Sequence, residues 1–393
     1  MRNFEFFAPT RVLFGRGTES LVGELVRAQG CRKALVHYGG GSAVRSGLLD
    51  RIYASLKEAG VDYVSLGGVV PNPRLSKVYE GIELCRAEGV DFLLAVGGGS
   101  VIDSAKAIGY GVVNDCDVWD FYEGKTAPGA CLPIGAVLTI AAAGSEMSKS
   151  SVITNEDGWL KKGYKNDLCR CKFAVMNPEL TVTLPQYQTM SGCVDILMHT
   201  MERYFGEERS MELTDQIGEG LMRTVIHHAH VLMSDPENYE SRAEIMWANS
   251  LSHNDLTGCG GSGDWASHQL EHELGGMFDV AHGAGLAAVW GSWARYVYRT
   301  NPARFAQLAV NVLGVPNRFD DPERTALEGI EAMEAFYRSI GMPTSIRELG
   351  VELTEEQIKE LAFKCTYRGR RTIGGFRVLG QQDIEEIYRM ARG

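Results

Sequence analysis

The sequence predicts two domains, an α/β domain with a parallel sheet over residues 1–184 and an all-α domain over residues 185–393. Three observations support this prediction. The chain has 393 residues, more than one ordinary hydrophobic core accommodates. Strand-like apolar runs alternate with amphipathic helical patterns in the first half, as they do in helix-covered parallel sheets. After Pro185 the helical patterns are long and no run resembles a strand.

Short apolar runs indicate the strands of the first domain, and amphipathic stretches between them indicate its helices. Strands are expected at 33–38, 61–66, 90–96 and 131–140, and helices near 46–59 and 74–88. The stretch 145–183 is more irregular and rich in strand-forming residues. Because strands that alternate with helices of this length pair in parallel, helices should cover the sheet.

Helix-start signals organise the second domain. Asp-Pro at 235–236 and again at 321–322 predicts two helix starts, each with proline at the first helical position. Thr354 and Gln357 have the spacing of a capping box, which predicts a third start.

Composition and charge exclude several classes of protein. The formal net charge of -11 argues against binding to nucleic acid or to an anionic membrane. No apolar run reaches the roughly 20 residues that span a bilayer, and no signal peptide opens the chain, so we expect a cytoplasmic protein. The nine cysteines are odd in number and scattered, which favours reduced thiols over a disulfide framework.

The tetrapeptide Gly-Gly-Gly-Ser occurs twice, each time after a predicted strand and before a predicted helix. The copies are Gly39, Gly40, Gly41 and Ser42, and Gly97, Gly98, Gly99 and Ser100. Glycine lets the backbone approach a ligand closely, and free amides at a helix start attract phosphate. The alternative is a tight turn without a ligand, but two such loops in one α/β unit favour a Rossmann-like dinucleotide-binding domain.

No carboxylate follows the first of these strands, which ends at Tyr38. Enzymes that use NAD usually place an Asp or Glu there to bind the ribose 2′-hydroxyl. A loop with Ser42 and free backbone amides would accept a 2′-phosphate, with Arg45 nearby. The sequence therefore predicts a preference for NADP(H) over NAD(H).

Eight of the nine histidines follow residue 198. Two pairs have the i,i+4 spacing that places side chains on one helix face: Asp195 with His199, and His268 with His272. Asp195 lies in an apolar run, so it should be buried and needs a partner. We predict one divalent metal ion held by Asp195, His199, His268 and His282. These ligands suit Fe²⁺, with the more tightly bound Zn²⁺ as the alternative.

The stretch His268-Gln-Leu-Glu-His272 also has the form of the inverted zinc-protease motif. A peptidase would use both histidines as ligands, and would not need a first domain with two glycine loops. We therefore assign His268 to the metal and His272 to the substrate side, as an acid/base or orienting group. Glu271 lies about 100° further round the helix and should point elsewhere.

Several motifs resemble those of the iron-containing, or group III, alcohol dehydrogenases along nearly the whole chain. In the first domain they are FGRGTE (14–19), YGGGS (38–42), PNP (71–73), VGGGSVIDSAKAI (96–108) and GSEMSKSSVIT (144–154). In the second they are VDILMHTMERYF (194–205), DWASHQLEHELGGMFDVAHGAGLAAVW (264–290) and IEEIYRMA (384–391). The chain most resembles the butanol dehydrogenases and broad-range NADPH-dependent aldehyde reductases of this family.

The resemblance implies a dehydroquinate synthase-like architecture and a homodimer. It implies the same four metal ligands, with His272 beside the nicotinamide and the substrate. It adds Asn72, Asp103, Thr139 and Lys161 to the residues around the cofactor. One departure is LTIAAAGSE (138–146), where many relatives carry threonines, so hydroxyl donors near the phosphates are missing.

These parts predict a metal-dependent, NAD(P)H-linked alcohol dehydrogenase or aldehyde reductase. Its substrates would be short-chain alcohols and aldehydes such as butanol and butanal, with hydride transfer to a metal-polarised carbonyl. The alternatives are a polyol dehydrogenase or a dehydroquinate synthase-like lyase. The lyase would use a Glu-His-His metal set and more basic residues for phosphate. A non-catalytic nucleotide-binding or scaffold protein would not need four metal ligands.

Overall fold

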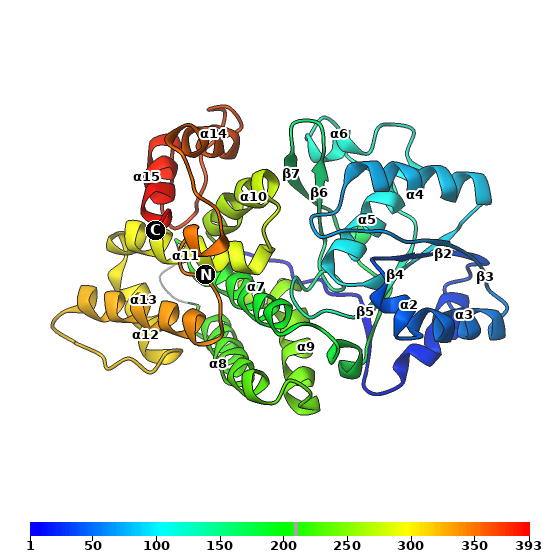
Figure 1. Ribbon diagram of the computed structural model, residues 1–393, viewed down its shortest axis with the longest axis horizontal. Coiled ribbons are helices and arrows are strands. Elements are labelled where there is room, and N and C mark those ends of the chain that lie inside the picture. The colour runs from blue at the N-terminus through cyan, green and yellow to red at the C-terminus, as the bar shows by residue number, and fades with distance from the viewer. Residues whose placement is uncertain (208–210) are drawn as a thin grey trace. The chain divides into compact units, whose positions relative to one another are not determined.

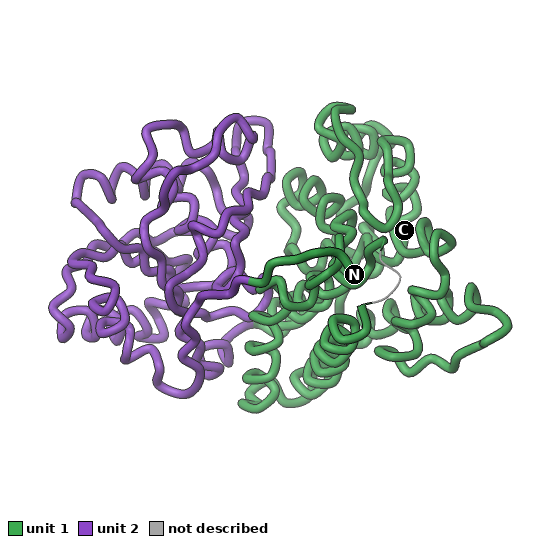
Figure 2. The backbone as a smooth tube through the Cα atoms, turned by 180° about the vertical axis from the view of Figure 1, so that it is seen from behind, with its two compact units in different colours: residues 1–6, 185–393 green, residues 7–184 purple. Residues whose placement is uncertain are grey.

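The computed structural model describes residues 1–207 and 211–393. These residues form two compact units, one of residues 7–184 and one of residues 1–6 and 185–393 (Figure 2). The first six residues therefore belong to the helical unit. In the described ranges, no helix has both the length and the apolar character needed to cross a membrane.

The α/β unit contains a six-stranded parallel sheet with the strand order β1-β8-β5-β4-β2-β3 (Figure 1). The strands are β1 (Arg11–Phe14), β2 (Lys33–Tyr38), β3 (Asp62–Leu66), β4 (Phe92–Gly97), β5 (Ile134–Leu138) and β8 (Phe173–Met176). A separate antiparallel hairpin pairs β6 (Ser150–Asn155) with β7 (Leu160–Lys165). The helices are α1 (Val22–Arg27), α2 (Ser42–Arg45), α3 (Leu48–Glu58), α4 (Leu75–Glu88), α5 (Gly99–Val113) and α6 (Trp119–Tyr122).

Helices cover both faces of this sheet. On one face, Leu94 and Val96 of β4 share a core cluster with residues of α1 and α3. Leu93 points to the opposite face, where a Cβ on Gly109 of α5 would lie 3.2 Å from its side chain. All residues of β4 are buried, because a central strand with helices on both faces has no solvated side. The predicted parallel, helix-covered sheet is confirmed.

The described residues of the second unit form helices joined by irregular connections, with one isolated β-bridge between Ile373 and Leu379. Its helices are α7 (Gln186–Tyr204), α8 (Glu212–Ser234), α9 (Tyr239–His253), α10 (Ala266–Phe278), α11 (His282–Val297), α12 (Pro302–Asn311), α13 (Pro322–Ser339), α14 (Glu355–Cys365) and α15 (Gln381–Ala391). Every residue of α7 from Thr189 to Tyr204 is buried, so this helix is surrounded by the others. The predicted all-α second domain is confirmed for these residues.

Two of the three predicted helix starts are correct. Asp321 caps α13, whose first residue is Pro322, and the capping box opens α14. The predicted start at Pro236 is wrong, because α9 begins at Tyr239. There the side chain of Asn238 accepts a hydrogen bond from a backbone N–H of the first turn. Asparagine caps a helix as well as aspartate does, so Asp235 and Asn238, three positions apart, were both candidates and the second one is used.

One histidine lies in the core of the α/β unit. His37 on β2 is fully buried; its Nδ1–H donates to the carbonyl of Leu66 (3.0 Å) and its Nε2 accepts from the hydroxyl of Ser104 (2.9 Å). Because Ser104 belongs to α5, this hydrogen bond ties that helix to the sheet. Burial lowers the pKa of His37 from 6.5 to about 4, so the imidazole is neutral in the folded protein at neutral pH.

We expect His37 to make the stability of the α/β unit depend on pH between 6.5 and about 4. In this range the unfolded histidine binds a proton that the folded one does not. The free energy of unfolding should therefore fall as the pH falls, by up to about 3 kcal/mol. The His37→Gln variant lacks the titrating group, so it should lose less stability on acidification. Urea unfolding of both proteins near neutral pH and near pH 4 measures how much free energy of unfolding each one loses on acidification. Equal losses would contradict the expectation.

Candidate cofactor and metal site

The two glycine loops follow neighbouring strands of the sheet. Tyr38 at the end of β2 pairs with Val96 of β4, so both loops leave the same edge of the sheet side by side (Figure 1). The chain runs from β2 outward to β3 and then returns to β4 on the other side of β2. Such a reversal of strand order marks the position at which open α/β sheets bind dinucleotides.

The second glycine loop has no room for side chains. A Cβ on Gly97 would lie 2.5 Å from Val101, one on Gly98 3.0 Å from Ile140, and one on Gly99 2.9 Å from the Cβ of Ala143. The loop leads into α5, a helix of 15 residues whose first N–H groups have no partner within the helix. A close-packed backbone that ends in free amides fits a pyrophosphate.

The first glycine loop lies beside a basic side chain. Gly41 precedes α2, and a Cβ built on it would overlap the guanidinium of Arg45. Gly40 faces open space, whereas the carbonyl of Gly39 accepts the N–H of Gly68 (3.0 Å). The loop thus presents backbone, the hydroxyl-bearing Ser42 and one arginine, without a carboxylate.

Two further predicted cofactor residues hold the glycine loop and α5 in place. The N–H of Thr139 donates to the carbonyl of Gly97 (3.1 Å). The carboxylate of Asp103 on α5 accepts from the hydroxyl of Ser145 (2.5 Å) and from the N–H of Val152 (2.9 Å). Asp103 therefore connects α5 to β6 and to the segment before it.

The last two predicted cofactor residues meet through the β6–β7 hairpin. Lys161 on β7 is buried and pairs with Thr154 of β6. The N–H of Thr154 donates to the carbonyl of Pro73 (2.8 Å), which holds the hairpin against the segment of Asn72. Asn72 is buried and has a φ of 54°, in the left-handed region that asparagine tolerates better than most residues.

Lys106, which we did not predict, organises the loop beside Asp103. Its side chain is fully buried, and its Nζ donates to the carbonyls of Ser145 (2.7 Å), Ser148 (3.0 Å) and Ser150 (2.7 Å). The hydroxyls of Ser145 and Ser148 lie at 3.0 and 3.3 Å. Five oxygens therefore surround one ammonium group, which compensates for its burial.

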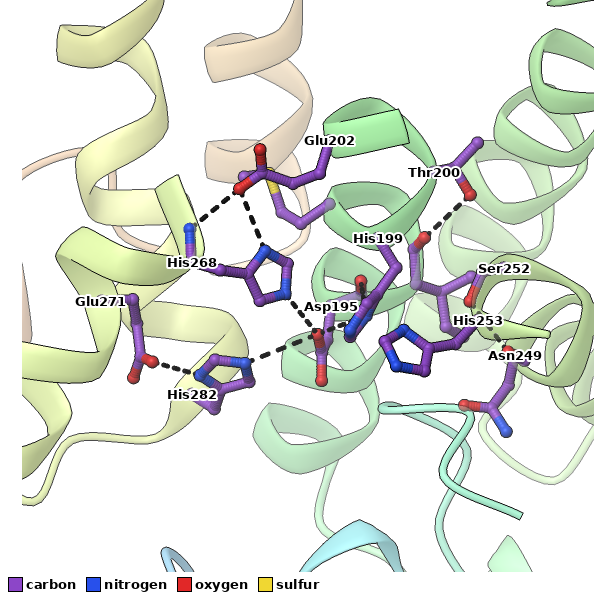
Figure 3. A network of polar contacts seen from close by, with 12 residues as sticks. Asp195, His199, Thr200, Glu202, Asn249, Ser252, His253, His268, Glu271 and His282 are labelled. Carbon is purple, nitrogen blue, oxygen red and sulfur yellow. Dashed lines mark hydrogen bonds and ion pairs between the residues drawn. The ribbon is translucent and has the colours of Figure 1, made fainter. Parts of the chain in front are cut away.

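Three helices of the second unit supply the predicted metal ligands (Figure 3). Asp195 and His199 lie on α7, His268 on α10, and His282 is the first residue of α11. The Nε2 atoms of His268 and His282 lie 3.8 and 3.7 Å from Oδ1 of Asp195. These distances are too long for hydrogen bonds. They fit two ligands of one ion, because bonds of about 2.1 Å span gaps of up to about 4 Å.

Two ligand atoms of this cluster are buried polar atoms that make no hydrogen bond to any described residue. Oδ1 of Asp195 and Nε2 of His268 are buried and have no hydrogen-bond partner among the residues that the structure describes. A buried polar atom without a partner costs free energy, and more so when it is charged. A divalent cation between them would satisfy both, so the donor set fits the implied metal.

His199 occupies a different place from the other three ligands. The ligand atoms of Asp195, His268 and His282 all lie within 4.8 Å of one another, a group that does not include His199. Nδ1 of His199 lies 2.9 Å from Oδ1 of Asp195 and donates to the carbonyl of that residue (3.0 Å). The structure thus brings three predicted ligands together and places the fourth beside Asp195.

Two buried carboxylates accept hydrogen bonds from the ligand imidazoles on the side away from Asp195, as Figure 3 shows. Glu202 accepts the Nδ1–H (3.1 Å) and the backbone N–H (2.8 Å) of His268. Glu271 accepts the Nδ1–H of His282. Both hydrogen bonds fix the tautomer that leaves Nε2 available for a metal.

The sequence interpretation missed both carboxylates. Glu202 lies seven residues after Asp195, two turns along the same face of α7, and this spacing could have identified it. The expectation that Glu271 points elsewhere is wrong, because α11 packs back against α10 and brings His282 to it.

The charges of this cluster shift its pKa values. Burial alone would raise the pKa of Asp195, but the imidazoles of His199 and His282 hold it well below its ordinary value. Burial lowers the pKa of His199 to about 4. Burial alone would also lower the pKa of His268, but the carboxylates of Asp195 and Glu202 raise it to about 9. Binding of a cation at Nε2 of His268 therefore competes with binding of a proton.

Comparison with known protein families identifies the family of the chain. Residues 9–178 match the family model of the iron-containing alcohol dehydrogenases, and residues 189–392 match the model of their C-terminal domain. The chain belongs to the iron-containing alcohol dehydrogenases. The resemblance inferred from the motifs is therefore confirmed.

Related alcohol dehydrogenases match over the full length. The chain is 40% identical to the probable NADH-dependent butanol dehydrogenase 1 of Bacillus subtilis, with 99% of each chain covered. It is 34% identical to the NADPH-dependent aldehyde reductase YqhD of Escherichia coli, with 100% of each covered. The crystal structure of NADH-dependent butanol dehydrogenase A from Thermotoga maritima has a TM-score of 0.96 and 38% identity, and the match covers 100% of this chain and 99% of that one.

In this alcohol dehydrogenase, the His-x-x-Glu-His stretch does not have the arrangement of a peptidase. Among the described residues, no group of close ligand atoms contains both His268 and His272. His272 groups instead with Glu271 and His282, and its ring centroid lies 5.9 Å from that of His282. His272 therefore lies next to the metal-ligand cluster without sharing the position that faces Asp195.

We expect Glu202→Gln to weaken metal binding by about 10- to 100-fold. The amide oxygen can still accept from Nδ1–H of His268, but without a charge it holds the imidazole less firmly and makes Nε2 less basic. Competition with a chromophoric chelator measures the dissociation constant. Glu212→Gln, on the exposed face of α8, is the matched control and should bind metal as the unmodified protein does. Equal affinities in all three proteins would rule out this role of Glu202.

Proposed function

We propose that this alcohol dehydrogenase reduces short-chain aldehydes such as butanal, and oxidises the alcohols in reverse, with a nicotinamide cofactor and one divalent metal ion. The convergence of two imidazole Nε2 atoms on Oδ1 of Asp195 carries the proposal. Membership of the iron-containing family supports the reaction class. The names of relatives, which include butanol dehydrogenases and an aldehyde reductase, support the substrate class.

Each unit has its own task in this proposal. Asp195, His199, His268 and His282 would hold the metal, which acts as a Lewis acid and stabilises negative charge on the carbonyl oxygen. His272 would transfer the proton of the product hydroxyl. The dinucleotide would bind to Gly39, Gly40, Gly41, Ser42, Asn72, Gly97, Gly98, Gly99, Ser100, Asp103, Thr139 and Lys161, and it supplies the hydride.

The ligand set supports Fe²⁺, with Zn²⁺ as the alternative. One carboxylate and three imidazoles suit both ions, and zinc binds such sites more tightly in the Irving–Williams order. A lyase of the dehydroquinate synthase type is less well supported, because its metal set is Glu-His-His whereas an aspartate lies at the centre of this cluster.

We further propose that NADP(H) is preferred over NAD(H). The support is the first glycine loop, which lacks a carboxylate and lies against the guanidinium of Arg45. Relatives differ on this point, since the butanol dehydrogenase of Bacillus subtilis is named NADH-dependent and the aldehyde reductase of Escherichia coli NADPH-dependent.

We also propose that the protein works as a cytoplasmic homodimer. Phe4, Phe6 and Phe7 are 55%, 45% and 50% exposed, an unusual concentration of apolar surface in one short segment. Sedimentation velocity, which gives the mass in solution, would reject the dimer if only the monomer were found.

The first test is oxidation of NADPH and NADH by the metal-reconstituted enzyme with butanal as substrate. We expect turnover with both cofactors and a higher kcat/KM with NADPH, because the loop accepts the 2′-phosphate. Faster turnover with NADH would discard the cofactor preference and keep the enzyme class. No oxidation across a panel of aldehydes, with Fe²⁺ and Zn²⁺ both tried, would overturn the proposed function.

Two histidine variants separate metal binding from proton transfer. His268→Ala should lose metal and activity together, because it removes an imidazole that faces Asp195. His272→Ala should keep the metal and lose about 10²- to 10⁴-fold in kcat, the usual contribution of a general acid. Metal analysis and steady-state kinetics measure the two effects, with His227→Ala on the exposed face of α8 as control. Full activity in His272→Ala would remove that residue from the mechanism.

A further inference from the structure

The first turn of α11 contains two glycines, Gly283 and Gly285, directly after His282. We propose that both are positioning residues of the metal site. Their missing side chains let α11 approach α7 and α10 closely enough for the imidazole of His282 to face Asp195. This inference rests on the proposed metal site and adds the constraint that sets its geometry.

Gly283 lies directly against Ser191 of α7. Its φ is not in the positive region, so glycine is needed at this position for the space that it leaves and not for backbone freedom. A Cβ there would overlap the carbonyl oxygen of Ser191 and lie 2.7 Å from its carbonyl carbon. Because the obstructing atoms belong to the backbone of α7, no change of rotamer can relieve the overlap. Any side chain at this position must push the two helices apart.

Gly285 lies at the contact of α11 with α10. A Cβ there would lie 2.9 Å from Cγ and 3.3 Å from Oε1 of Glu271. Glu271 is fully buried and accepts the Nδ1–H of His282. A side chain at this position would therefore displace the carboxylate that orients the imidazole. This overlap involves a side chain, so it should be milder than the one at Gly283.

Both contacts lie next to the ligand atoms. Ser191 precedes Asp195 by one turn of α7, and Gly283 follows His282 directly. The separation that they control is the 3.7 Å between Nε2 of His282 and Oδ1 of Asp195. Metal–ligand distances tolerate only about 0.2 Å, so a helix shift of about 1 Å would take His282 out of the site.

Close packing of a glycine is not by itself a sign of this role. Gly329 on α13 is also confined, since a Cβ there would lie 2.4 Å from the Cβ of Ala309 on α12. None of its three nearest atoms belongs to a residue of the metal cluster. Gly329→Ala is therefore a matched control, with the same chemical change in another helix pair of the same unit and a steric overlap between those at Gly283 and Gly285.

The test compares Gly283→Ala, Gly285→Ala and Gly329→Ala with the unmodified protein. Affinity for Co²⁺ is measured by chelator competition, and the visible absorption spectrum of bound Co²⁺ reports the ligand geometry independently of turnover. We expect Gly283→Ala to bind Co²⁺ at least about 10-fold more weakly with an altered spectrum, and Gly285→Ala to show a smaller loss. Gly329→Ala should unfold at lower temperature but keep the affinity and the spectrum.

The outcomes separate this inference from the proposed function. If the unmodified protein binds no Co²⁺, Fe²⁺ or Zn²⁺, the metal site itself is wrong. If it binds metal and both α11 variants match it in affinity and spectrum, the role of the glycines is wrong. Equal losses in Gly283→Ala and Gly329→Ala would also overturn it, because they would reflect general destabilisation. Should Gly283→Ala fail to fold, the milder Gly285→Ala decides on the same two measurements.

Discussion

The carboxylate of Asp195 is the constraint around which the helical unit is built. It lies on a helix that other helices surround, with almost no exposed surface. An isolated charge in such a place costs several kcal/mol, so neighbouring elements must compensate for it. They do so in layers: imidazoles from α10 and α11 face the carboxylate, and two further carboxylates hold those imidazoles from the other side. The close approach of α11 is the condition for this arrangement.

The α/β unit contains a buried positive charge that is likewise compensated by polar groups around it. One of its buried charges is the ammonium of Lys106, and the compensation comes from backbone carbonyls and hydroxyls of one loop. Asp103, one turn earlier on the same helix, holds that loop through Ser145. A helix that begins at a glycine loop is thereby joined to the segment on which the loop packs. In both units, polar groups in the interior specify the shape of a site and not only its chemistry.

Periodicity and spacing in the sequence predicted the sheet and its helices, and they identified Asp195, His268 and His282, whose ligand atoms lie within 4.8 Å of one another, because these features depend on local patterns. Asp195 and His199 are one turn apart, and so are His268 and His272, so a helix brings each pair onto one face. What the sequence could not supply was the packing of α10 against α11, which turns Glu271 towards His282. Lys106 was missed for a related reason. A lysine in a helix is usually exposed, and only the tertiary fold surrounds this one with oxygens. The start of α9 was misplaced because two capping residues lie three positions apart.

Lys106 also distinguishes the two sites in how their cations are acquired. Elsewhere in proteins, a loop wrapped around a positive charge through carbonyl oxygens is often organised by a dissolved ion. Here the charge is covalently attached, so each molecule receives it at synthesis and cannot lose it by dilution or chelation. The shape of the loop over residues 145–150 should therefore not vary with the sodium or potassium content of the medium. A metal ion at the cluster around Asp195, by contrast, has to be bound from the divalent ions in solution.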